Sequence, residues 1–163
     1  MKDSQTLCLE SLSNVRIPKD YDILEQVGEK FFTKLCNSYP KLRIFIFDDH
    51  YDLGSSWKLL VDAVRQVLKD LYNESALRTF AENFVRDRTC NQLVVCLPYE
   101  DPPGEDEWKG FFFTFRDFIR EEYSAEMDWK TANAWNFIAH RFGGLCAEQY
   151  EILYKESRKH LFP

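Results

Sequence analysis

The sequence predicts an all-α fold with six to eight helices. Apolar residues recur three and four positions apart along most of the chain, which is the spacing of one face of an α-helix. The one long stretch rich in helix breakers, residues 97–107, holds three of the six prolines and is expected to be a loop. Only 41–47 and 94–97 also fit a strand, so a two-stranded ribbon is the alternative for those two segments.

Length and composition favour one globular domain. A chain of 163 residues suits a single domain with a sizeable core. Aromatic residues make up 16% of it, including 14 phenylalanines, which indicates a bulky core or an apolar cavity with something in it. The net charge is −6, and basic residues gather on no one stretch, so binding of a nucleic-acid backbone is not expected.

The domain is expected to span residues 20–157, after an N-terminal segment at 1–19 with room for a first helix and before a tail at 158–163. Polar residues interrupt every apolar run near the N-terminus, and no apolar run approaches the roughly 18 residues that a membrane span needs. We therefore expect no signal peptide, no membrane insertion and a cytoplasmic location.

The first half of the domain predicts three helices. Residues 20–39 carry apolar side chains at helical spacing, and Pro40 should end that helix because its ring cannot continue one. Residues 55–72 place a broad apolar face on one side of a second helix. The third is expected at 75–86, where apolar residues follow the i, i+3, i+4, i+7 spacing.

The second half predicts a helical hairpin. Residues 107–123 form a strongly apolar helix, and the run FFFTF within it is expected to be core. A long final helix is expected at 129–157, with Gly143 and Gly144 as the place for a kink.

These elements resemble the globin family over about residues 20–145. Gly28 and Pro40 stand twelve apart, as do a glycine in the second globin helix and the proline that opens the third. The run FFTKL between them and the pair Ala134–Trp135 also resemble globin patterns. The resemblance implies a three-over-three helical sandwich around a pocket for heme.

The residue expected to hold the iron is a phenylalanine. In globins the pattern Leu-x-x-Leu-Ala-x-x-His closes with the proximal histidine, whose nitrogen bonds the iron. The corresponding run here is Leu77-x-x-Phe80-Ala81-x-x-Phe84, and phenylalanine has no lone pair to donate. The resemblance therefore implies that ordinary heme ligation has been lost. Cys90 stays open as an unusual iron ligand.

The other heme-pocket counterparts follow from the same resemblance. Ser56 is expected at the distal position, with Leu53 and Ser55 as alternatives in register, and Phe45 or Phe47 at the aromatic clamp. The inward face of the globin helix above the heme is resembled by a set on one predicted helix, Leu60, Val64, Val67 and Leu68. The helix below the heme is resembled by a set on the next, Leu77, Phe80 and Ala81. Trp57, beside the distal position, is unusual there and should either spread the helices or fill space.

Cysteines and histidines give no further site. The five cysteines are odd in number and contain no CxxC, so reduced thiols are expected, with a redox sensor or an intermolecular disulfide as the alternative. His50 is expected to be solvated, although it stays open as an unusual distal ligand. His140 is expected at the surface or half-buried, and His160 disordered or on the surface. The residues concerned are Cys8, Cys36, Cys90, Cys96, Cys146, His50, His140 and His160. No catalytic motif is present, so we expect no enzyme.

Three functions remain. The first is a globin-like domain without ordinary heme ligation that acts as a sensor or interaction module, in which Phe80, Phe84 and Trp57 fill the cavity or an apolar ligand occupies it. The second is a heme globin for oxygen or another diatomic gas with unusual axial ligation. The third is a helical interaction domain without globin ancestry. No cofactor is expected. Heme is the cofactor that the resemblance would allow. A protein partner or an apolar ligand fits the first function, and the oligomeric state is left open.

Overall fold

The computed structural model describes residues 2–45, 52–89 and 102–161. Every regular element among them is helical, so the prediction of an all-α fold is confirmed. The α-helices are α1 (Ser4–Ser11), α2 (Tyr21–Ser38), α3 (Leu53–Lys69), α4 (Glu74–Thr89), α6 (Glu105–Tyr123), α7 (Trp129–Ile138) and α8 (Gly144–Leu161). Two 3₁₀ segments, Leu12–Asn14 and Pro40–Phe45, and a π-helical turn, Ala139–Gly143, complete the order.

Aspartates cap several helices at their N-termini. The carboxylates of Asp20, Asp52 and Asp128 precede α2, α3 and α7, and each accepts a hydrogen bond from a backbone N–H of the first turn. Such caps satisfy donors that have no partner inside the helix and contribute about 1 kcal/mol each. The bonds donated by Ser55 and Thr131 lower the pKa of Asp52 and of Asp128.

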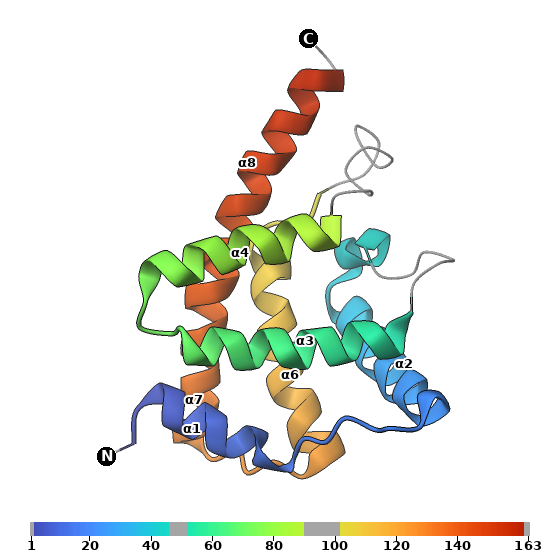
Figure 1. Cartoon of the computed structure of the whole chain (residues 1–163), viewed down its shortest axis with the longest axis vertical. Helices are drawn as coiled ribbons and strands as arrows, with labels where there is room; N and C mark the ends of the chain where they lie inside the picture. The colour runs from blue at the N-terminus through green and yellow to red at the C-terminus, as the bar shows by residue number, and fades with distance from the viewer. Residues whose placement is uncertain (1, 46–51, 90–101, 162–163) are drawn as a thin grey trace.

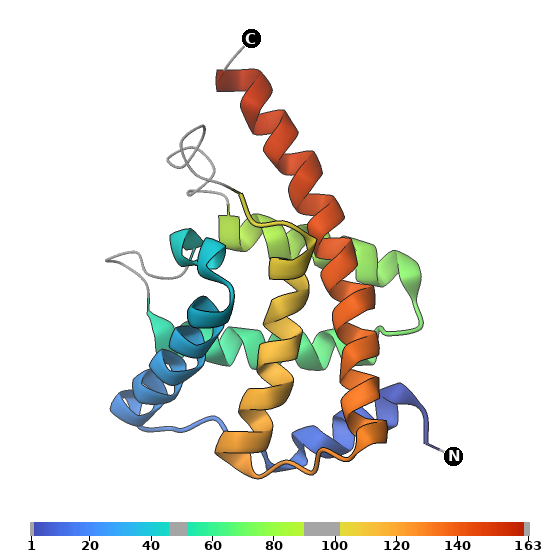
Figure 2. The same ribbon diagram turned by 180° about the vertical axis from the view of Figure 1, so that it is seen from behind.

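The helices form two sides of one body. Figure 1 shows α3 and α4 toward the viewer with α6 and the α7–α8 pair behind them, and Figure 2 shows the reverse. The helix α2 packs chiefly on α3, α4 packs chiefly on α8, and α1 closes the lower end against α7.

The crossing of α2 and α3 depends on glycine. A Cβ atom on Gly28 would lie 2.2 Å from the carbonyl oxygen of Leu53 and 2.9 Å from the backbone nitrogen of Gly54. Those distances leave no room for any side chain, so the two helix backbones touch. This close crossing sets the position of α3, and with it the place of its buried face in the core.

Two sequence predictions about local structure need correction. Pro40 ends α2 as expected, but residues 40–45 form a 3₁₀ helix, so a strand at 41–45 is wrong; its suggested partner at 94–97 lies outside the described residues. Proline presets a helical φ, which favours a tight turn over an extended strand at this point.

The long final helix is also interrupted. Where one helix was expected at 129–157, α7 and α8 are joined by the π-helical turn, which ends at Gly143. A Cβ atom on Gly143 would lie 2.8 Å from the Cα atom of Lys109, so α6 passes close to this turn. The interruption falls where the kink was predicted, and α8 continues to Leu161.

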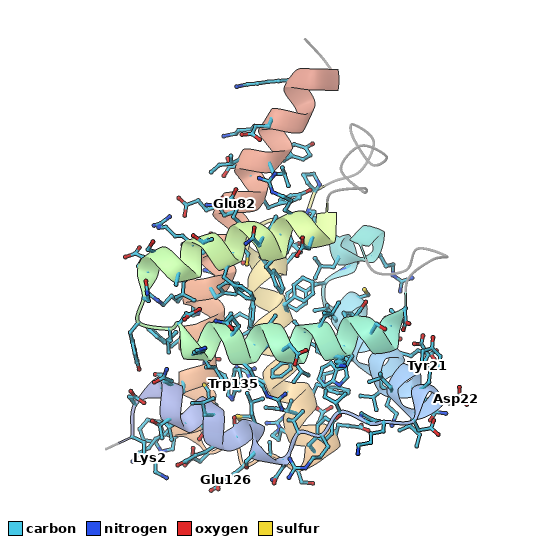
Figure 3. All side chains as sticks on the ribbon, viewed as in Figure 1. Lys2, Tyr21, Asp22, Glu82, Glu126 and Trp135 are labelled. Atoms are coloured by element: carbon cyan, nitrogen blue, oxygen red, sulfur yellow. The ribbon has the colours of Figure 1, made fainter. Side chains whose placement is uncertain are left out.

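A single hydrophobic core joins these elements. The N-terminal segment contributes to it through Cys8 and Leu12, which are buried with residues of the other helices. The buried indole of Trp135 on α7 donates to the hydroxyl of Ser11 at 2.9 Å, and Figure 3 marks its position inside the body. Among the described residues, no helix is both long and apolar enough to cross a membrane.

Candidate functional site

Phe84 lies at the centre of a group of aromatic rings. It is 3% exposed, and α4 turns it toward α6 and the π-helical turn. Its ring meets Phe111 at 6.1 Å and Phe142 at 5.6 Å, both edge to face, and lies 6.4 Å from Phe112. Phe80, one turn earlier and only partly buried, stacks on Phe142 at 5.7 Å. We call these five rings the proximal cluster.

The chemistry of the proximal cluster is apolar packing. Edge-to-face and offset ring pairs each add about 0.5–1.5 kcal/mol beyond the burial of their surface. Its five rings consist of carbon and hydrogen alone, so they can offer no nitrogen, oxygen or sulfur atom to an iron. The cluster therefore does not fit an axially ligated heme at position 84.

Trp57 fills space between α2, α3 and α6. Its side chain is fully buried, with its ring 5.0 Å from Phe31, 5.6 Å from Phe115 and 5.1 Å from Phe118. The sequence left open whether this indole spreads the helices or fills a cavity. Because α2 and α3 still touch at Gly28, the indole is accommodated without separating them. We call these four rings the distal cluster.

The remaining predicted pocket residues on α3 divide between core and surface. Leu60 and Val64 are buried in the core. Ser56 is only partly buried, and its hydroxyl donates to the carbonyl oxygen of Asp52 at 2.8 Å. Leu53 is buried beside the glycine crossing, and Ser55 is exposed. The assignment of Ser56 to a distal position stays a prediction.

Several predicted residues cannot be placed. Phe47, His50, Cys90 and Cys96 lie outside the described residues. Phe45 ends the 3₁₀ helix, but its side chain lies outside the described part, as does that of His160. His140 is exposed, and the centre of its imidazole lies 5.5 Å from the ring centre of Phe113 in an edge-to-face arrangement.

The two clusters are joined through α6. That helix gives Phe111 and Phe112 to the proximal cluster, and Phe115 and Phe118 to the distal cluster. The sequence correctly predicted FFFTF as core. Helical spacing also placed Phe142 on the apolar face of the final helix, but it could not show that this ring meets Phe84.

The described grooves lie elsewhere on the surface. One of about 390 Å³ lies between residues 102–105 and α8, lined in part by Pro103, Ala147 and Tyr154. None of the predicted heme-pocket residues lines it.

Three described cysteines are buried, namely Cys8, Cys36 and Cys146. Cys8 is 0% and Cys36 is 1% exposed. Burial raises the pKa of Cys8, and it raises the pKa of Cys36 to about 11 against an opposing effect of Arg43. Both thiols are therefore poor nucleophiles at neutral pH, which favours the reduced structural role.

This burial predicts a loss of stability in alkali. Burial raises the pKa of the Cys36 thiol from its unfolded value of 9.0 to about 11 in the folded protein. The contribution of this thiol to stability is therefore fully present below pH 9.0 and is lost as pH rises through about 11. We expect the free energy of unfolding to fall over that window less steeply in Cys36→Ala than in the parent chain. Urea denaturation at stepped pH measures both slopes, and equal slopes would contradict the prediction.

Comparison with known proteins gave no relative. No protein-family model, no curated protein and no solved structure matches this chain.

Proposed function

We propose that this chain is a globin-like domain that has lost ordinary heme ligation and acts as a sensor or protein-interaction module. The fold follows the globin helix order in this reading, with α2 crossing α3 at glycine and the α6 and α7–α8 hairpin behind them. The two aromatic clusters occupy the interior where the resemblance expects a porphyrin.

One observation carries the proposal. The side chain at the expected iron position, Phe84, is a buried hydrocarbon ring packed against Phe111 and Phe142. An apolar ring in that place stabilises the fold by packing, because an empty cavity there would cost about 24 cal/mol per Å³. The same ring cannot make the axial bond through which a globin controls its iron.

Hemin titration of the purified chain tests the proposal. We expect the protein to be colourless after purification and to develop no sharp Soret band on addition of one equivalent of hemin. An ordinary globin that binds one hemin per chain serves as the positive control. Stoichiometric heme with a defined axial ligand would overturn the proposal in favour of the gas-binding alternative.

A second candidate is a helical interaction domain without globin ancestry. It is favoured by the packing of α4, which lies against α8 and, through Phe84, against α6, and touches little of α3. An experimental structure in which α3 and α4 do not enclose the proximal cluster would favour this candidate over the first.

A further inference from the structure

The helices α6 and α7 present one outer face of the molecule. Figure 2 shows them side by side toward the viewer, with no other described element in front. Arg116 of α6 donates a hydrogen bond to the side-chain oxygen of Asn136 on α7. One turn earlier on α6, the ring of Phe113 meets the imidazole of His140, one turn later in the chain than Asn136, so the helices run antiparallel. The outward side chains of both helices are here called the α6–α7 face: Phe113, Arg116 and Arg120 from α6, and Trp129, Asn133 and Phe137 from α7.

Two large apolar side chains are exposed on α7. Trp129 is 71% exposed and Phe137 is 43% exposed, whereas Trp135, on the opposite side of α7, is fully buried. Trp129 is also the exception among the four tryptophans, because the other three are fully buried. Tryptophan is enriched among the residues that dominate protein–protein binding, so an exposed tryptophan on the same side as an exposed phenylalanine favours an interaction surface. The charges around these two rings decide which surface can cover them.

The α6 half of the face carries a net charge of +1. Arg116 forms an ion pair with Asp117 at 2.9 Å, so these two charges cancel. Arg120 is exposed one turn beyond Arg116 and adds one positive charge, so that two cations stand against one anion. The charges next to this half are already balanced by ion pairs, of Lys109 with Glu105, of Lys34 with Glu121 and of Lys30 with Glu122.

The α7 half of the face carries a net charge of −1. Glu126 and Asp128 are exposed just before α7, and Asp128 stays charged because the backbone hydrogen bond that it accepts lowers its pKa. Lys130, exposed in the first turn of α7, supplies one opposing cation, so that two anions stand against one cation. Lys2, whose pKa is raised by its ion pair with Glu10 and to a smaller degree by Glu126, is balanced by Glu10.

The two halves of the face are complementary to each other. When two copies stack face to face about a two-fold axis parallel to the helices, α7 of each copy lies over α6 of the other. The half with charge −1 then meets the half with charge +1 at both contacts, which favours a second copy over a uniformly acidic or basic partner. With His140 neutral at pH 7, the face sums to zero in a chain of net charge −6, so two copies repel each other least here.

We propose that the α6–α7 face is the interface of a homodimer. In the stack each α7 runs antiparallel to the α6 that it covers, as neighbouring helices do in an antiparallel four-helix bundle. Two helices present a strip on the order of 20 Å wide, so the dimer would bury on the order of 1,000 Å² in total. An area of that size is typical of weak, reversible association. The inference goes beyond the proposed interaction role and does not depend on the loss of heme.

The antiparallel register also gives each exposed ring a partner in the second copy. Because Arg116 is level with Asn136, Trp129 is level with the last turn of α6, about one turn from Arg120. A two-fold axis parallel to the helices keeps these levels, so the guanidinium of Arg120 in one copy reaches the indole of Trp129 in the other, which is a favourable cation–π contact. Phe137 is level with Arg116 of the other copy and can cover its aliphatic stem.

Sedimentation equilibrium tests the homodimer directly. The single chain has a mass of 19.4 kDa. We expect the weight-average mass to rise toward twice that value as the protein concentration increases from about 5 to about 500 µM, the range suited to a small interface. A mass that stays at 19.4 kDa throughout that range would overturn the inference.

The variant Trp129→Ala locates the interface. It should weaken dimerisation about tenfold or more, because it removes the most exposed ring of the face. Leu59→Ala, at a 62% exposed position on α3, is the matched control and should leave the dimerisation constant unchanged. Circular dichroism of both variants confirms folding. A dimer that survives Trp129→Ala, or that Leu59→Ala weakens equally, lies on another surface and overturns the inference.

Exchanging one charge between the halves gives an independent test at two exposed positions. Arg120→Glu changes the α6 half from +1 to −1, and Glu126→Arg changes the α7 half from −1 to +1, so each single variant should weaken dimerisation about tenfold. The double variant again has opposite charges on the two halves and should dimerise within about threefold of the parent. A double variant that does not recover would overturn the charge-matched stacking. Hemin binding would contradict the proposed loss of heme ligation without affecting these measurements, so the two failures are distinguishable.

Discussion

The substitution Gly28→Ala is expected to destabilise the folded chain by about 3 kcal/mol, the upper end of ordinary overpacking. The added methyl carbon would sit 2.2 Å from the carbonyl oxygen and 2.5 Å from the carbonyl carbon of Leu53. Both are backbone atoms, so relief requires α2 and α3 to separate. That movement would also loosen the contact of Phe31 with Trp57, now 5.0 Å between ring centres. Urea denaturation followed by circular dichroism measures the loss.

Gly144→Ala is the matched control for this prediction. Gly144 begins α8, and a Cβ atom there would meet nothing within 4 Å. Alanine in a helix is favoured over glycine by about 1 kcal/mol, so this variant should be as stable as the parent or slightly more stable. If the two variants change stability alike, the close approach of α2 and α3 is wrong.

The substitution Phe84→His is expected to give the chain heme binding, or to strengthen it. An imidazole at position 84 supplies the nitrogen that an axial bond to iron needs. Burial among the rings of Phe111 and Phe142 favours the neutral imidazole, which is the form that binds a metal. Titration with hemin should give a Soret band that saturates near one equivalent.

Phe84→Leu serves as the control, because it removes the ring without adding a donor. It should remain colourless in the same titration and lose stability through the smaller side chain. A folded Phe84→His protein that takes up no heme would show that either the register of α4 or the globin-like fold is wrong. The Soret band reports whether heme is bound, and circular dichroism reports separately whether the variant is folded.

The helices could be predicted because their apolar spacing is local information. The buried face of α3, with Leu60 and Val64, follows directly from a 3.6-residue period. Residues 41–45 show where this fails, since alternation in a short run also fits a strand. The sequence could not decide between a strand and a 3₁₀ helix at this point, because the deciding factor was the turn that Pro40 begins.

The candidate site was only partly predictable. The burial of Phe84 and Trp57 follows from their places on helical faces. The identity of their neighbours does not, because Phe111 and Phe115 come from a helix distant in sequence and depend on how α6 packs against α2 and the π-helical turn. Such tertiary packing has no periodic signature in the chain.

The π-helical turn at Ala139–Gly143 sets α7 and α8 out of phase. One extra residue in a helix rotates everything after it by about 100° about the axis. Trp135 before the turn and Tyr150 after it are both buried, so the position of Tyr150 depends on the rotation that the turn introduces. Deletion of a single residue between positions 139 and 143 would rotate the whole of α8 about its axis. The helical hydrogen bonds could re-form after the deletion, but Tyr150 would lose its contact with Trp108.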